Sequence, residues 1–148
     1  MKYPFNVRIY AIIQNKGKVL VSDESYDNWH ITKFPGGGLE FGEGTIDCIK
    51  RELWEELGIH INSVEHFYTT DFFQASAQNP KVQVISIYYQ VKLENPNQIA
   101  VKEKPFDFGL NSIKQCFRWI DIASIEANTL TLPVDQAVAM KLKSGYLE

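Results

Sequence analysis

Runs of apolar, β-branched and aromatic residues alternate with polar segments along this chain and predict its strands. Phe5 to Gln14 forms the first run, and the turn signal Asn15-Lys16-Gly17-Lys18 separates it from the short run Val19-Leu20-Val21. This pattern predicts a β-hairpin. Further strands are expected within Val64 to Phe73, over Val82 to Leu93 and over Cys116 to Ile122. The second of these is apolar or aromatic almost throughout, which is typical of a central strand.

The segment from Thr45 to Leu57 is predicted to be an amphipathic helix. It contains no helix-breaking residue, Thr45 is a candidate N-cap, and Gly58 supplies the left-handed residue that commonly ends a helix. At roughly 100° per residue, its aliphatic side chains form one stripe that is suited to burial against a sheet. The stripe comprises Ile46, Ile49, Leu53 and Leu57.

A second helix is predicted from Val134 to Lys143, with Pro133 suited to its first turn. Three segments are polar and are expected to be loops: Ser22 to Lys33, Gln74 to Lys81 and Glu94 to Gln115. Loops as long as the last one tend to be functional or mobile. The order of strands, helix, strands and helix predicts a mixed sheet with helices packed on it.

Composition restricts the classes of protein to which this chain can belong. Its 148 residues predict one domain, and 45% hydrophobic and 22% charged residues are ordinary for a soluble globular protein. A net charge of −3 without a basic run argues against non-specific nucleic-acid binding. The sequence has no signal-peptide pattern and no apolar window approaching the ~18 residues of a membrane span. Cys48 and Cys116 lack metal-like spacing, so a reduced, cytoplasmic setting is the simplest expectation.

Candidate chemistry is concentrated where a glycine-rich loop, Gly37 to Gly44, leads into the first predicted helix. Glu52 and Glu56 lie one turn apart on the same helix face, with Glu55 beside them. Such close like charges repel one another by roughly several tenths of a kcal/mol per exposed pair, so a purely structural helix gains nothing from them. A divalent cation such as Mg²⁺ resolves the repulsion, because it takes carboxylate oxygens and keeps waters for a phosphate substrate.

The same residues resemble the Nudix box of the Nudix hydrolases. Gly37, Glu43 and the run Arg51-Glu52-Leu53-Trp54-Glu55-Glu56-Leu57-Gly58-Ile59 fill every defined position of that motif. The alternative is a solvated acidic helix face, which the flanking glycines and the complete spacing disfavour. The resemblance implies the Nudix-type α/β/α sandwich with a curved mixed β-sheet. The motif covers about a sixth of the chain, so fold and chemistry carry over better than the substrate does.

The resemblance also implies an activity for the whole chain, 1-148, as a single Nudix hydrolase domain. Nudix hydrolases cleave a nucleoside diphosphate linked to another group, by attack of water at phosphorus, with Mg²⁺ (or Mn²⁺) as cofactor. The implied partner is a small-molecule nucleotide, of the nucleoside triphosphate or the ADP-ribose and sugar-nucleotide type. No nucleic-acid or membrane partner is expected, and a monomer and a homodimer both remain open. The alternative function is a non-catalytic nucleotide-binding sensor, which we would expect to have lost box carboxylates.

Site residues are carried over from the motif position by position. Glu52 and Glu56 become metal ligands, Glu55 becomes a ligand or the general base, and the Gly37 carbonyl becomes a further ligand. Arg51, which counts among the catalytic residues, is expected to lie away from the metal face and to form a structural ion pair with Glu43. Some family members take the base from a distant loop, for which the candidates here are Glu94, Glu103 and Asp107.

Substrate contacts are less determined by the sequence. Arg8 and Lys33 are candidates for contacting phosphate oxygens, with an ordinary surface charge as the equal alternative. Aromatic residues can stack on a base, although core packing or loop anchoring is favoured for any single one; the candidates are Phe34, Tyr26, Trp29, Phe106 and Phe108. Trp54 points away from the carboxylates and the apolar stripe, which indicates packing under a neighbouring loop or a subunit contact.

Overall fold

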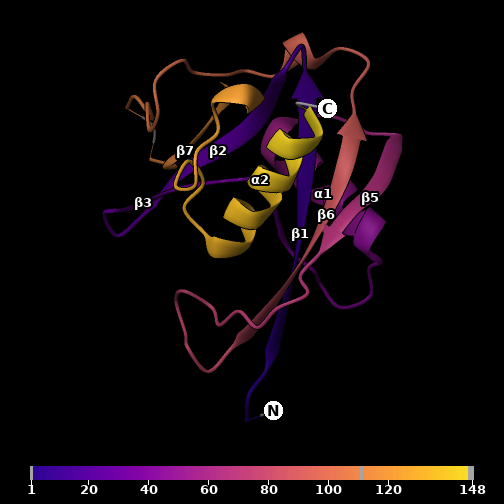
Figure 1. Cartoon of the computed structure of the whole chain (residues 1–148), viewed down its shortest axis with the longest axis vertical. Helices are drawn as coiled ribbons and strands as arrows, with labels where there is room; N and C mark the ends of the chain where they lie inside the picture. The colour runs from indigo at the N-terminus through magenta and orange to yellow at the C-terminus, as the bar shows by residue number, and fades with distance from the viewer. Residues whose placement is uncertain (1, 111, 147–148) are drawn as a thin grey trace. The chain divides into compact units, whose positions relative to one another are not determined.

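The computed structural model describes residues 2–110 and 112–146 (Figure 1). As predicted, the fold combines a curved, unclosed mixed β-sheet with two α-helices. The chain forms two compact units, each built from two segments. The first unit comprises Met1–Ile12 and Pro35–Leu93, and the second unit comprises Ile13–Phe34 and Glu94–Glu148. The single domain expected for the whole chain stays a prediction.

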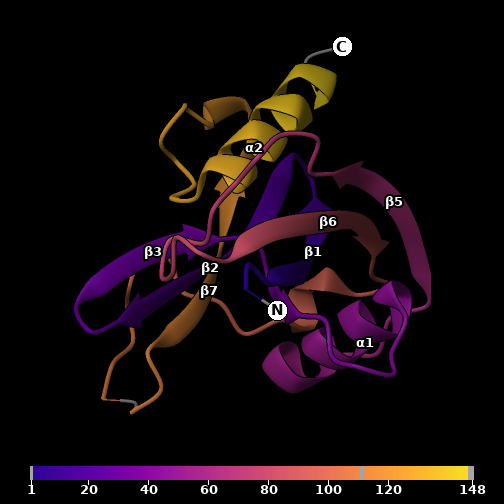
Figure 2. The ribbon, with the colours of Figure 1, turned by 90° about the horizontal axis from the view of Figure 1, so that it is seen from below.

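The first unit contains most of strand β1 (Phe5–Asn15), together with β4 (Gly36–Gly38), α1 (Thr45–Leu57), β5 (Ser63–Thr69) and β6 (Gln83–Lys92). Strand β6 lies between β1 and β5, which confirms its predicted central position, and β5 pairs with it in antiparallel register. Strand β4 pairs with β1, also in antiparallel register. Figure 2 shows the curvature of β5 and β6.

Helix α1 has its predicted bounds but a different buried face. Ile49 and Leu53 are fully buried as expected, whereas Ile46 is 43% exposed and its place in the core is taken by Cys48. The buried face is therefore centred near Ile49 and is turned toward the side of the helix that carries Glu52. The predicted apolar stripe was wrong at its first residue, because Ile46 lies in the first turn and at the edge of the true contact surface.

Glycine residues cap both ends of α1. The N-cap is Gly44 rather than Thr45, with φ −79° and ψ 168°, so the predicted cap was displaced by one residue. The Thr45 hydroxyl instead shares a hydrogen bond of 2.5 Å with the Tyr89 hydroxyl on β6. At the other end Gly58 is left-handed, with φ +66°, and its N–H donates to the Trp54 carbonyl, which confirms the predicted stop.

The second unit contains β2 (Lys18–Tyr26), β3 (Trp29–Lys33), β7 (Gln115–Asp121) and α2 (Pro133–Tyr146), with short 3₁₀ turns at Pro96–Gln98 and Ile122–Ser124. Strand β2 pairs in antiparallel register with β3 on one side and with β7 on the other. The last residues of β1 pair with β2 and form the predicted hairpin.

The prediction of a loop from Ser22 to Lys33 was wrong. This segment forms most of the hairpin β2–β3, and its turn residues Asp27 and Asn28 have φ of +47° and +68°, as primed hairpin turns require. The sequence misleads here because Asp23 and Glu24 are polar and yet buried. Their partners include Arg118 and Gln115 on the distant strand β7 as well as residues of the same hairpin, so the polarity of the segment does not indicate exposure.

The remaining elements follow the prediction closely. Gln74 to Lys81 has no strand or helix beyond one isolated bridge, and the described residues of the long segment after β6 are irregular apart from the 3₁₀ turn at Pro96–Gln98. Helix α2 begins at Pro133, as expected, and continues to Tyr146. Within residues 2–110 and 112–146, no helix is both long and apolar enough to span a membrane.

Candidate active site

The glycines of β4 allow α1 to approach this strand closely. A Cβ atom on Gly37 would lie 2.5 Å from the Glu52 Oε1 atom, and a Cβ atom on Gly36 would lie 2.1 Å from the Ile9 carbonyl oxygen. Gly36 also has φ +143°, a conformation that other residues rarely adopt. Glycine at position 37 therefore creates the space in which the Glu52 carboxylate lies, and contact with strand β4 limits the positions of this carboxylate.

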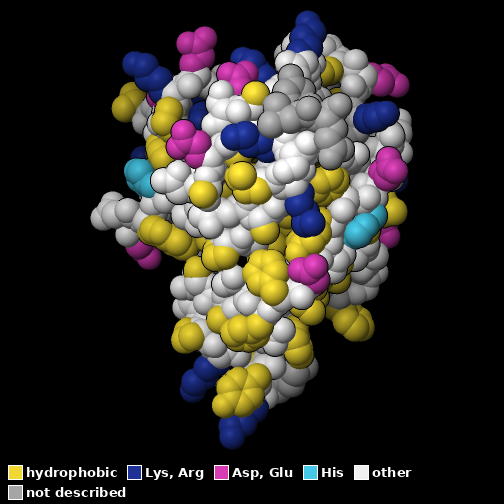
Figure 3. Space-filling view, in the orientation of Figure 1, with side chains coloured by type: hydrophobic (Ala, Val, Ile, Leu, Met, Phe, Trp, Pro, Cys, Tyr) yellow, Lys and Arg dark blue, Asp and Glu magenta, His cyan; other side chains and the backbone are white. Residues whose placement is uncertain are grey.

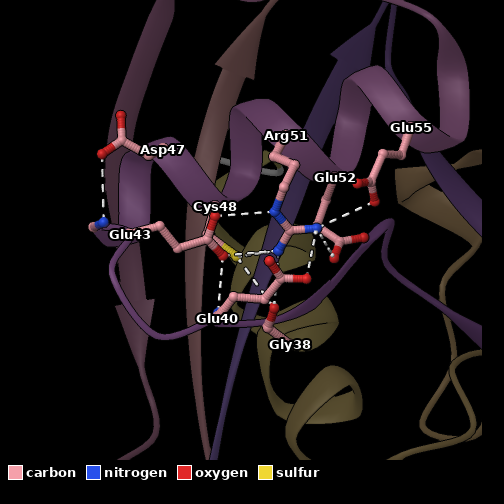
Figure 4. A network of polar contacts seen from close by, with 9 residues as sticks. Gly38, Glu40, Glu43, Asp47, Cys48, Arg51, Glu52 and Glu55 are labelled. Atoms are coloured by element: carbon pink, nitrogen blue, oxygen red, sulfur yellow. Dashed lines mark hydrogen bonds and ion pairs between the residues drawn. The ribbon is translucent and has the colours of Figure 1, made fainter.

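Arg51 is the centre of the polar network on α1 (Figure 4). Its Nε donates to Glu43 Oε2 at 2.9 Å and its Nη2 donates to Glu43 Oε1 at 2.7 Å. This two-bond pair confirms the predicted link between the glycine-rich loop and the helix. Nη2 also donates to the Gly38 carbonyl at 3.2 Å, so one guanidinium holds both ends of the loop.

The expectation that Arg51 lies away from the carboxylate face was wrong. Its Nη1 donates to Glu52 Oε1 at 3.0 Å and to Glu55 Oε2 at 3.1 Å, and it lies 3.7 Å from Glu40 Oε1. The helical angle places the Arg51 Cα away from Glu52, but the long side chain reaches back along the helix surface. The Arg51 guanidinium is therefore paired with four carboxylates.

This network changes the acidity of its members. The hydrogen bonds from Arg51 lower the pKa of Glu43 from 4.5 to about 2, and they keep the Arg51 guanidinium protonated by raising its pKa further. Burial, followed by the hydrogen bond with Glu43, raises the pKa of the Cys48 thiol to about 12. Cys48 is therefore a neutral packing residue beneath the network, and its thiol donates to the Gly38 carbonyl at 3.6 Å.

The predicted metal ligands Glu52, Glu55 and Glu56 supply oxygen donors of the kind that Mg²⁺ prefers. In this structure their carboxylates face protein partners: Glu52 and Glu55 accept from Arg51, and Glu56 Oε2 accepts from the Gly36 N–H at 3.2 Å. Accordingly, among the described residues no group of three or more His, Cys, Asp or Glu side chains is arranged to hold a metal ion. The donor types fit a divalent cation, and coordination requires side chains to turn, most readily Glu55, which is 56% exposed.

The predicted substrate contacts fall in both units. In the first unit, Arg8 is half-buried on β1 and is paired in register with Gly38 of β4. Its Nε donates to the Tyr10 hydroxyl at 3.1 Å, so its guanidinium is oriented beside the glycine-rich strand. In the second unit, Lys33 and Phe34 are buried, and Lys33 Nζ lies 3.2 Å from Glu24 Oε2. Burial favours the packing alternative for Phe34. Lys33 is not the ordinary surface charge given as its alternative, because it is buried and paired with Glu24.

The structure gives the positions of the remaining candidate residues but does not assign them a role. The loop acids Glu94, Glu103 and Asp107 are exposed in the second unit. Trp54 is 52% exposed and stacks on His60 with ring centroids 4.4 Å apart, so it packs within its own unit as one of the two alternatives predicted.

Sequence reasoning missed Tyr89. Its hydroxyl bonds to Thr45 and ties the first turn of α1 to β6. Tyr89 stands in a run that is apolar or aromatic almost throughout, where nothing in the sequence distinguishes it from an ordinary core residue.

Comparisons with known proteins agree with this geometry. The model of the NUDIX domain family matches residues 2–140. Phosphatase NudJ of Escherichia coli K12 is 28% identical over 130 residues, which cover 87% of this chain and 77% of NudJ. The MutT NUDIX hydrolase of Burkholderia pseudomallei superposes with a TM-score of 0.67 at 16% identity, covering 92% and 96% of the two chains. A NUDIX hydrolase of Nitrosomonas europaea gives 0.65 at 23% identity, covering 96% and 90%. These two structures are similar in fold.

Proposed function

The chain belongs to the Nudix family of enzymes, which hydrolyse pyrophosphate bonds, and we propose that its reaction requires Mg²⁺ or Mn²⁺ and acts on a nucleotide. The substrate is a nucleoside diphosphate linked to another group, either a nucleoside triphosphate or a sugar nucleotide such as ADP-ribose. The observation that carries this proposal is the position of the Glu52 carboxylate, which packs against Gly37. Any residue other than glycine at position 37 would place its Cβ atom in the space that this carboxylate takes. Glu55 and Glu56 stand beside it on the same helix.

In this proposal, Glu52 and Glu56 would hold the cation, with the Gly37 carbonyl as a further ligand and Glu55 as either a ligand or the general base. When bound, the cation would neutralise the pyrophosphate and lower the pKa of the attacking water. The Glu55 carboxylate accepts the proton from that water, which its exposure supports. An acidic residue of the long loop, Glu94, Glu103 or Asp107, is the alternative base.

Arg51 has two tasks in the proposed site. Through Glu43 and the Gly38 carbonyl it holds the glycine-rich loop in place, and through Glu52 and Glu55 it keeps neighbouring carboxylates from repelling one another. Arg8 is the proposed contact for phosphate oxygens, because it is a cation paired in register with Gly38 and oriented by Tyr10.

The alternative function is a nucleotide sensor without catalysis. Its supporting observation is that, over the described part of the chain, the carboxylates face Arg51 and Gly36 and form no ready-made metal site. Against it stands the complete set of box carboxylates, which a binding module has no need to keep.

A substrate panel separates these functions. The purified protein is incubated with nucleoside triphosphates, ADP-ribose, dinucleoside polyphosphates and sugar nucleotides, with Mg²⁺ or Mn²⁺, and the nucleotide products are separated by chromatography, because cleavage of ADP-ribose or a sugar nucleotide gives two phosphomonoesters and no free phosphate. We expect turnover of at least one compound, and a loss of roughly a hundredfold or more in kcat/KM for Glu55→Gln and for Glu56→Gln.

The matched control is Glu65→Gln, because Glu65 is an exposed glutamate of the same unit on β5. It is expected to keep wild-type kinetics. Absence of turnover with every compound would support the sensor, and full activity in both α1 variants would remove the role assigned to this helix face.

A further inference from the structure

Phe106, in the long loop of the second unit, has a backbone conformation that bulky residues rarely adopt. Its φ is +58°, in the left-handed region, where a phenylalanine carries an energetic penalty that glycine does not. Over the described residues, the other non-glycine residues with positive φ are Lys16, Asp27 and Asn28, which lie in tight hairpin turns. A loop that needed only this bend would be served better by glycine, so the strain indicates a use for the ring itself.

A buried carboxylate holds this strained residue in place. The Phe106 N–H donates to Asp23 Oδ2 at 3.4 Å, and Asp23 is completely buried in β2. The same carboxylate accepts from Arg118 Nε at 2.6 Å and from the Thr32 hydroxyl at 2.7 Å. Because strands β2, β3 and β7 supply these groups, the position of Phe106 is set by the sheet of its own unit.

The Phe106 ring is presented at the surface. It is half-exposed and stacks on the exposed imidazole of His30, with ring centroids 4.6 Å apart and planes inclined by 24°. His30 Nδ1 is hydrogen-bonded to the Ser25 hydroxyl at 2.9 Å, which orients the imidazole. Phe108 lies beneath, buried, and meets the Phe106 ring edge-on at 6.2 Å.

Of the other aromatic residues considered for base stacking, Tyr26 and Trp29 are exposed beside the β2–β3 turn, without the strained backbone of Phe106. Phe34 and Phe108 are buried and cannot present a ring face to a ligand. Lys114, whose Nζ lies 5.8 Å from the centroid of Phe108, adds a positive charge beside the cluster. A planar ring linked to a phosphate matches both features, because bases stack on aromatic faces and phosphates pair with ammonium groups.

We propose that Phe106 and His30 form an aromatic platform that binds the base of a nucleotide. The choice of a nucleotide rests on the proposed function, whereas the platform rests on residues of the second unit alone. Stacking tolerates any base, so the platform supplies affinity for the ring and leaves discrimination between bases to other contacts.

Phe106→Gly tests the platform, because glycine relieves the strain while it removes the ring. Binding of AMP, GMP, CMP and UMP is measured by calorimetry in the presence of EDTA, so that no pyrophosphate bond and no metal is involved. We expect the thermal midpoint to stay equal or to rise, and the affinity for the bound monophosphates to fall roughly five- to a hundredfold. Binding of ribose 5-phosphate, which has no ring to stack, is expected to stay unchanged.

The control is Phe73→Ala. Phe73 is 72% exposed in the first unit. In this unit, hydrophobic side chains gather over the start of β1 and the segment between β5 and β6 on the face shown in Figure 3. This variant is expected to bind the monophosphates as the wild type does. His30→Ala is the second test variant, in case Phe106→Gly does not fold, and it is expected to lower the same affinities.

Two results would overturn the platform: wild-type protein that binds none of the four monophosphates, or unchanged affinities in Phe106→Gly and His30→Ala. These results are independent of turnover. A chain that hydrolyses nothing in the substrate panel and still loses monophosphate binding in Phe106→Gly keeps the platform and loses the proposed hydrolase.

Discussion

Each unit of this molecule contains one arginine–carboxylate cluster, and the two clusters are built in opposite ways. In the first unit one guanidinium, Arg51, is shared among four carboxylates, some of which are largely exposed. In the second unit one carboxylate, Asp23, is completely buried and accepts from Arg118, Thr32 and the Phe106 N–H.

The difference separates a cluster that can exchange partners from one that cannot. Around Arg51 four carboxylates surround one guanidinium. One carboxylate can therefore turn toward a bound metal ion without leaving a buried charge unpaired. Around Asp23 every donor converges on one buried carboxylate, and loss of the carboxylate would leave those donors without a partner. The first cluster therefore suits catalysis, and the second suits stability.

Removal of the buried charge should produce the largest effect on folding. Asp23→Asn is expected to lower the free energy of unfolding by about 3 kcal/mol, near the lower end for breaking a buried pair, because Arg118 keeps 17% exposure. The measurement is urea denaturation with comparison of midpoints and slopes. Asp27→Asn, in the exposed turn of the same hairpin, is the control and is expected to change stability by less than about 0.5 kcal/mol. Equal midpoints for the two variants would contradict the structural role of Asp23.

For Arg51→Lys we expect a large effect on catalysis and a small effect on stability. The ammonium group cannot form the two-bond pair with Glu43 and reach Glu52 and Glu55 at the same time, so kcat/KM should fall at least about tenfold. Stability should fall by only about 1 kcal/mol, since the pairs are partly exposed. Kinetics on the substrate found in the panel and urea denaturation are measured together.

Lys50→Gln, at the exposed neighbouring position, is the control for that variant. The comparison of the two clusters fails if Arg51→Lys unfolds as easily as Asp23→Asn while it retains wild-type kinetics.

The smallest effect is a dependence of stability on pH that comes from Glu43. Its pKa falls from 4.5 in the unfolded chain to about 2 in the folded protein. A lowered folded-state pKa means that this stabilisation is fully present above pH 4.5 and is lost as the pH falls toward 2. The difference in unfolding free energy between the wild type and Glu43→Gln should therefore be largest near neutral pH and shrink through this acidic window. A difference that grows on acidification would show that Arg51 does not hold Glu43 in solution.

The first cluster was largely predictable from the sequence, and the second was not. Helix α1 and its stop at Gly58 follow from spacings within a short stretch of chain, where helical geometry applies directly, and the Arg51–Glu43 pair was implied by the resemblance of this stretch to the Nudix box. The same geometry misjudged the reach of Arg51, because it describes where Cα atoms lie and says nothing about where a flexible side chain ends.

The hairpin β2–β3 shows why the rest could not be predicted. Asp23 and Glu24 indicate a polar loop when the sequence is read locally, whereas Arg118 and Gln115 on β7 satisfy them in the folded unit. Tyr89 is a similar case, since its bond to Thr45 joins two elements 44 positions apart. Interactions of this range depend on which strands become neighbours, and hydrophobic patterning does not determine that.

The pairing of β2 with β7 has a consequence for the order in which the chain folds. Asp23 and Arg118 are 95 positions apart, and the intervening chain includes the whole segment Pro35–Leu93 of the other unit. Closure of so long a loop is entropically unfavourable and slow. During synthesis β2 therefore leaves the ribosome long before β7 exists. The edge of β2 that pairs with β7, and the carboxylates of Asp23 and Glu24, have no β7 partner until the last quarter of the chain is made. Until then they are accessible to chaperones.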